Sequence, residues 1–178
     1  MLIVVALWGF AEATLFFIVA DLPISAIGLR CGWGRAWRAG TVAAVAAALG
    51  GQVMLHWSRT APSAVWNLLL YVPGLGPDLL AAEVAAWRQD GFTAMASGAF
   101  RGVPYKVYAT AAGLDGTAAL PFFVQSIAAR LPRFLLVAAV SAWLGPRLRR
   151  VLSGRAIAAL FVAFWTAFYA FYFAMTRY

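Results

Sequence analysis

The sequence contains few residues of the types that build catalytic and metal centres. Its 178 residues include one cysteine, Cys31, and one histidine, His56. A single cysteine cannot form an internal disulfide or a thiolate metal cluster. The sequence also shows no Ser-His-Asp constellation, no metal-ligand spacing and no nucleotide-binding glycine loop. We therefore expect that the protein is not an enzyme and holds no metal ion and no cofactor.

Charged residues are also scarce. Only 11% of the residues are charged and 64% are hydrophobic, whereas soluble domains have roughly a quarter charged and half apolar residues. Long apolar runs, without ten-residue alternation, favour membrane helices. The composition therefore predicts an all-α integral membrane protein with a single domain over residues 1–178.

Acidic residues are the rarest charged type, with 6 Asp and Glu against 14 Lys and Arg. In a soluble protein this excess would suggest binding to nucleic acid. Here many of the basic residues lie in two segments beside apolar runs, residues 30–38 and 145–155. Because that pattern follows the positive-inside rule, we expect two cytoplasmic loops and no nucleic-acid partner. No cleavable signal peptide is expected, since the start lacks basic residues and its apolar run carries Glu12.

The segment 98–113 is apolar, yet it contains features that a continuous spanning helix avoids. Arg101 and Lys106 would each cost about 2.5–3.5 kcal/mol at membrane depth. Pro104 removes a backbone donor and disfavours helix at the residue before it. We expect two half-helices over about 93–114 that meet at residues 102–104 in a re-entrant hairpin. The alternative is a loop between two ordinary helices, with its charges at the membrane interface.

Residues 1–29 form a second apolar stretch with interruptions. Glu12 lies within the apolar run, and Asp21-Leu-Pro23 predicts a break in the helix. We interpret the stretch as another re-entrant hairpin, with Glu12 on the ingoing arm and Asp21 at the turn. The alternative is one spanning helix with a proline kink.

Three further runs predict membrane-spanning helices, over about 39–57, 117–144 and 156–176. Arg130 and Arg133 lie near the middle of the second run and, being three residues apart, project from one side of a helix. Buried arginines need anionic partners, and the acids within apolar sequence are Glu12 and Asp21. We therefore expect these four residues to pair or to share a polar cavity. The aromatic end of the last run predicts a lipid-facing anchor.

An amphipathic helix is predicted over about 78–90. Leu80, Val84 and Trp87 share one face at spacings of four and three residues, and we place Glu83 off that face. Such a helix would lie on the membrane surface. Its role is either scaffold or a gate over a substrate path.

The order of these elements predicts an inverted repeat. Two re-entrant hairpins dip into the membrane from opposite faces, and each is followed by a transmembrane helix. An extra transmembrane helix follows at the C-terminus. That architecture places a binding site near the bilayer midplane.

Particular segments carry a family resemblance. The run Phe100-Arg-Gly-Val-Pro-Tyr-Lys-Val-Tyr-Ala-Thr-Ala-Ala-Gly113, followed by Ala129-Arg-Leu-Pro-Arg-Phe134, resembles the DedA (SNARE-associated, VTT-domain) membrane proteins, in their short bacterial branch. Phe10-Ala-Glu-Ala-Thr-Leu-Phe-Phe17 with Asp21-Leu-Pro23 is similar to the acidic motif of that family's first hairpin. The resemblance covers about residues 8–145. The family's commoner second motif has two arginines spaced differently around a Phe-x-Pro segment, and this chain departs from it.

The resemblance implies a flippase or scramblase in a bacterial inner (plasma) membrane. The substrate would be a phosphate-bearing lipid, such as undecaprenyl phosphate or a phospholipid, and transport would be coupled to protons. Arg101, Lys106 and Tyr105 are then the candidate ligands of the phosphate headgroup. Glu12, Asp21, Arg130 and Arg133 are the candidates for proton coupling or charge pairing. The partners are membrane lipids, and a homo-oligomer is compatible with the sequence.

Two other classes of function remain open. A proton-coupled transporter of a small solute would use the same charges in a closed cavity without a lateral opening. In a structural membrane partner, the arginines would only neutralise the acids.

Overall fold

The computed structural model describes residues 1–175, and all regular structure in that part of the chain is helical. The helices are α1 (Leu2–Ala13), α2 (Asp21–Cys31), α3 (Trp33–Thr60), α4 (Pro62–Leu69), α5 (Pro77–Asp90), α6 (Phe92–Arg101), α7 (Tyr105–Leu114), α8 (Ala119–Val151) and α9 (Gly154–Met175).

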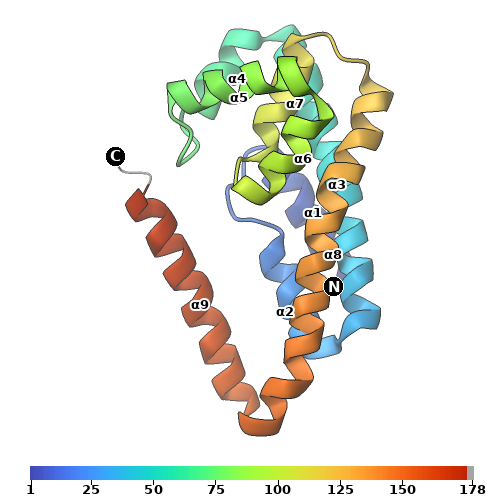
Figure 1. Ribbon diagram of the computed structural model, residues 1–178, viewed down its shortest axis with the longest axis vertical. Coiled ribbons are helices and arrows are strands. Elements are labelled where there is room, and N and C mark those ends of the chain that lie inside the picture. Colours follow the sequence, from blue (N-terminus) through green and yellow to red (C-terminus); the bar gives the residue numbers. More distant parts are fainter. Residues whose placement is uncertain (176–178) are drawn as a thin grey trace.

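The long helices α3 and α8 pack side by side and form the centre of the fold (Figure 1). Small residues make this contact possible, because the buried face of α3 consists mostly of alanine and glycine. At Gly40, a Cβ atom would lie only 3.3 Å from the carbonyl oxygen of Phe134 on α8. The two backbones therefore approach closely at this point.

Four short helices, α1, α2, α6 and α7, pack on this pair. Helix α1 packs against α3, and α6 packs against α8. Their successors exchange partners, since α2 packs mainly against α8 and α7 packs against α3. The contact of α1 with α3 depends on glycine: a Cβ atom at Gly50 would lie 2.7 Å from the Phe10 carbonyl oxygen.

Both predicted helix breaks are present. The second lies where the sequence predicts it, at residues 102–104, with Gly102 ending α6 in the left-handed conformation at φ 84°. The position of the first was predicted wrongly. The break spans residues 14–20, and Asp21 is the first residue of α2 rather than a turn residue. Pro23 lies in the first turn of α2, where the helix leaves backbone N–H groups without a partner and tolerates proline.

Two segments expected to be loops are mostly helical. Helix α3 begins at Trp33, so only Gly32, at φ 72°, separates it from α2. Helix α8 runs on to Val151, and residues 152–153 form the whole connection to α9. Arginine and leucine are good helix formers, so a cluster of basic residues marks a membrane boundary without ending a helix. The short helix α4 was not predicted.

Helix α5 forms where the amphipathic pattern predicts it, but it is not free on the surface. It packs against α6 and α7 and buries four residues, Leu80, Glu83, Val84 and Trp87. The Trp87 ring meets the Phe122 ring of α8 edge-on, with centroids 5.7 Å apart. The helix is therefore part of the structure around the second break.

Among residues 1–175, three helices are long and apolar enough to cross a membrane: Trp33–Thr60, Ala119–Val151 and Gly154–Ala174. The last of these helices stands apart from the bundle (Figure 1). Only 6% of its most apolar stretch is buried, against 61% for that of α3. An apolar surface of this size requires a covering layer, which lipid supplies. The protein is therefore a helical, membrane-embedded protein.

Candidate functional site

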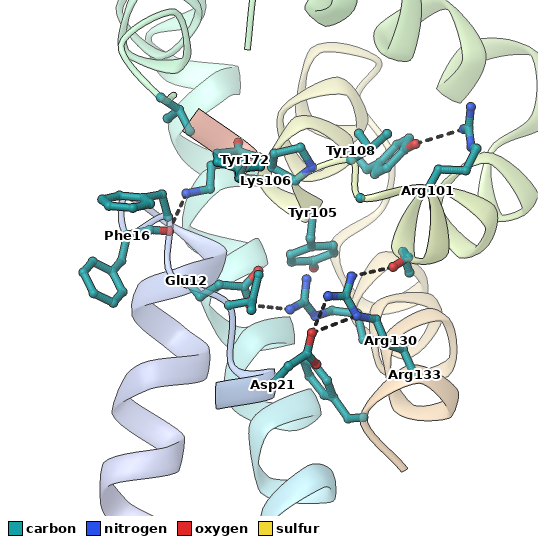
Figure 2. A pocket seen from close by; sticks show the side chains of 18 of the residues that line it. Glu12, Phe16, Asp21, Arg101, Tyr105, Lys106, Tyr108, Arg130, Arg133 and Tyr172 are labelled. Atoms are coloured by element: carbon teal, nitrogen blue, oxygen red, sulfur yellow. Dashed lines mark hydrogen bonds and ion pairs between the residues drawn. The ribbon is translucent and has the colours of Figure 1, made fainter. Parts of the chain in front are cut away.

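A cavity of about 260 Å³ lies between the two helix breaks, α8 and α9 (Figure 2). The structure brings together all seven residues that the sequence analysis selected. The cavity is lined by Glu12, Asp21, Arg101, Tyr105, Lys106, Arg130 and Arg133. These residues come from five different helices, α1, α2, α6, α7 and α8, so the site exists only in the folded protein.

Arg130 and Glu12 form a buried ion pair between α8 and α1. The Arg130 guanidinium also lies between two rings, 4.7 Å from the centroid of Tyr105 and 4.9 Å from that of Phe134. A cation over aromatic faces gains electrostatic stabilisation that grows as water is excluded. Arg130 is therefore held by one carboxylate and two rings.

Arg133 and Asp21 form the second pair. Two guanidinium nitrogens of Arg133 donate to Oδ2 of Asp21, and the third donates to the Ala99 carbonyl oxygen at 2.5 Å. Arg133 thereby joins α8 to both α2 and α6. The expectation that Glu12 and Asp21 pair with these two arginines is confirmed. The pairing avoids an unpaired buried charge, which would be strongly destabilising.

Lys106 differs from the two arginines. Its side chain is buried, with 2% of the residue exposed, and its ammonium donates a 2.8 Å hydrogen bond to the Phe16 carbonyl oxygen. Among residues 1–175, no carboxylate lies within ion-pair distance of it. This part of the cavity therefore holds three cations against two carboxylates, which leaves one positive charge uncompensated.

Two other buried polar atoms of the cluster have unused hydrogen-bonding capacity. Within the described part of the chain, Nε of Arg130 and Oδ1 of Asp21 find no hydrogen-bond partner. Most buried polar atoms in folded proteins do have one. The cluster thus retains both a donor and an acceptor beyond its internal ion pairs.

Tyr105 supports the cluster through its ring. Its hydroxyl donates to Oγ of Ser126 at 2.6 Å, and its ring stacks on Phe122 at an interplanar angle of 11°. The same ring lies against Gly51 of α3, where there is no room for a Cβ atom. These contacts fix the aromatic face that Arg130 meets.

A second polar group, which the sequence analysis missed, lies beside Arg101. Glu83 of α5 was expected off the buried face, yet it is 6% exposed and accepts a hydrogen bond of 2.5 Å from the Tyr108 hydroxyl. Arg101 is 3.4 Å from the same carboxylate oxygen, and its side chain is 53% exposed. The signal was present in the spacing, because Glu83 is three residues after Leu80 and four before Trp87, on one helix face.

The aromatic end of α9 was predicted as a lipid-facing anchor, and this is only partly correct. Phe168, Tyr169 and Tyr172 line the cavity. The Tyr169 hydroxyl accepts a 2.9 Å hydrogen bond from the Val19 N–H in the first break, and Tyr172 donates to the Pro73 carbonyl oxygen. Other aromatics of this helix, such as Phe164 and Phe171, are exposed. One face of α9 therefore forms a wall of the cavity.

The fold and the site define a class: a membrane-embedded helical protein with a buried, charge-paired cavity. No protein-family model matches the chain, and no solved structure matches it. The chain is similar to an uncharacterized protein of Haemophilus influenzae, with 37% identity over 67 residues. That match spans 37% of this chain and 35% of the relative's length.

Proposed function

We propose that the protein moves a phosphate-bearing lipid, such as undecaprenyl phosphate or a phospholipid, across a bacterial inner membrane. The observation that carries this proposal is Lys106, a buried cation that has no acidic partner among residues 1–175, whereas Arg130 and Arg133 beside it are both paired with carboxylates. A buried charge is costly unless it is compensated. An anionic ligand would supply the missing negative charge.

The cavity lining suits an amphipathic ligand. Lys106 offers a point charge to a phosphate, and the paired arginines offer further donors at short range. The part of the lining that comes from α9 consists of the aromatic residues Phe168, Tyr169 and Tyr172. A lipid headgroup would lie at the charged side, with its hydrocarbon chain leaving past α9 into the bilayer. A small polar solute would make few favourable contacts with these aromatic residues.

The arrangement in the membrane follows from helix length. Helices α1, α2, α6 and α7 have 12, 11, 10 and 10 residues, whereas crossing the hydrocarbon core of about 30 Å takes about 20. We infer that α1 with α2, and α6 with α7, are re-entrant hairpins. The exchange of packing partners on α3 and α8 supports an inverted repeat, with α9 as the extra helix. The basic segments 30–38 and 145–155 would face the cytoplasm.

The same geometry offers a route for proton coupling. Protonation of Glu12 would break its ion pair with Arg130 and free that guanidinium for phosphate. The cavity would then carry one more positive charge, which would strengthen the binding of a phosphate group. Arg133, which Asp21 and Ala99 hold on two sides, would keep the hairpins in register.

The test is reconstitution into liposomes with a lipid-sidedness assay. Lys106→Ala should abolish movement of the phosphate lipid while the protein stays folded. Arg88→Ala is the control, because Arg88 is an exposed cation of α5 that pairs with Asp115 and does not line the cavity. If the folded Lys106→Ala variant moves lipid normally, the cavity is scaffold, and the protein is better described as a structural partner.

A further inference from the structure

The group formed by Glu83, Tyr108 and Arg101 has no role in the proposed function. The three residues come from α5, α7 and α6. Arg101 and Tyr108 line the same cavity as Lys106 (Figure 2), whereas Glu83 is not one of the lining residues. A buried acid at the edge of an anion site is unexpected, because it disfavours a bound anion.

Glu83 is held unequally by its two partners. Tyr108 donates a short hydrogen bond to it at 2.5 Å, and both of these side chains are buried. Arg101 lies at 3.4 Å from the same oxygen, with half of its side chain exposed. Ion pairs with such an exposed partner contribute little to stability. Arg101 can therefore exchange its partner while Tyr108 keeps the carboxylate in place.

The Tyr108 ring is itself fixed by close packing. It lies on Gly98 of α6, where a Cβ atom would collide with the phenol ring. Tyr108 is also flanked by α5 through Glu83 and by Arg101 at the end of α6. The carboxylate of Glu83 consequently cannot follow Arg101 into the cavity.

We propose that Glu83 is a specificity-determining residue that holds Arg101 at the cavity mouth until a phosphate group displaces it, and that its remaining charge selects singly charged over doubly charged phosphates. This inference rests on the proposed function of the cavity. On arrival of a phosphate, Arg101 turns from Glu83 to the ligand, and Glu83 stays behind as a fixed negative charge. Its repulsion is about twice as large for a phosphomonoester dianion as for a phosphodiester, because Coulomb energy scales with charge.

The test measures binding of two short-chain lipids to the purified protein in detergent by calorimetry. Dihexanoyl phosphatidylglycerol is a phosphodiester, and dihexanoyl phosphatidic acid is a phosphomonoester, mostly doubly charged at pH 7.5. Glu83→Gln keeps an acceptor for Tyr108 but removes the charge. We expect it to bind the diester about threefold and the monoester about tenfold more tightly, since doubling the energy squares the ratio.

Asp115→Asn provides a matched control. It removes one negative charge from another ion pair of α5, that with Arg88, outside the cavity. Its affinities should equal those of the wild type for both lipids. An equal gain in Asp115→Asn and Glu83→Gln would show an effect of net charge alone and would overturn the inference.

Tyr108→Phe gives an independent readout if Glu83→Gln does not fold. Without the hydroxyl, Glu83 is free to stay with Arg101, so both lipids should bind about threefold more weakly. If the wild type binds the lipids and the folded Glu83→Gln and Tyr108→Phe variants bind them with the same affinities, the role of Glu83 is overturned. The proposed function of the cavity would still stand. Absence of binding by the wild type would overturn both.

Discussion

Lys106 and Phe16 are 90 residues apart in the sequence, and the Lys106 ammonium donates a hydrogen bond to the Phe16 carbonyl oxygen. Phe16 lies in the break after α1, and Lys106 lies in the first turn after the break between α6 and α7. A continuous helix would have used that carbonyl in its own backbone bonding. The two interruptions thus meet, and one supplies the acceptor that the other's buried cation requires.

The accessibility of Lys106 can be measured directly, because it is the only lysine in the sequence. An amine-reactive reagent should modify Lys106 slowly in the purified protein, since the residue is buried. A phosphate-bearing lipid should slow the reaction further. Mass spectrometry separates this product from modification of the N-terminal amine, whose rate should not respond to the lipid. An unprotected Lys106 in the presence of bound lipid would place the headgroup elsewhere.

The Arg130–Glu12 pair should dominate the stability of the cavity. Arg130→Met leaves Glu12 buried without its partner, and we expect a loss of about 3–5 kcal/mol in the free energy of unfolding. Adding Glu12→Gln should recover most of that loss, because the isolated charge is then gone. Thermal unfolding in detergent measures both variants. Equal stability of the single and the double variant would show that the unpaired Glu12 carboxylate carries no penalty and would contradict the prediction.

Close packing of α1 on α3 predicts a steric effect at Gly50. In Gly50→Ala the new Cβ atom would lie 2.7 Å from the Phe10 carbonyl oxygen and 2.9 Å from the Ala13 side chain. Overpacking of this kind typically costs about 1–3 kcal/mol. Gly34→Ala on the same helix has open space around it and should be neutral or stabilising by up to about 1 kcal/mol. The prediction fails if the two variants unfold at the same temperature.

Membrane sidedness distinguishes a re-entrant hairpin from a single kinked span at residues 1–29. With Cys31 replaced by serine, we introduce Ile3→Cys or Gly34→Cys, both at exposed positions. If α1 and α2 form a hairpin, a membrane-impermeant thiol reagent should reach both positions from the same, cytoplasmic side. Labelling from opposite sides would favour the kinked span. A cysteine introduced near the other end of α3, by His56→Cys, is the control, because it should be labelled from the opposite side of the membrane.

The sequence by itself determined the helical class, the break at residues 102–104 and the need for Glu12 and Asp21 to find cationic partners. These features depend on local backbone chemistry and on the cost of charge in apolar surroundings, which act wherever the chain folds. The amphipathic helix over residues 77–90 could be predicted for the same reason, since its periodicity is local.

Only the tertiary structure decided which charges meet. Arg130 pairs with Glu12 across 118 residues and Arg133 with Asp21 across 112, whereas Lys106 receives a backbone carbonyl instead of a carboxylate. The burial of Glu83 required α5 to pack on α6 and α7, and the position of Tyr169 required α9 to fold back over the first break. Partner choice among several similar charges depends on three-dimensional approach, because Coulomb attraction and desolvation vary with position and residue type alone does not set them.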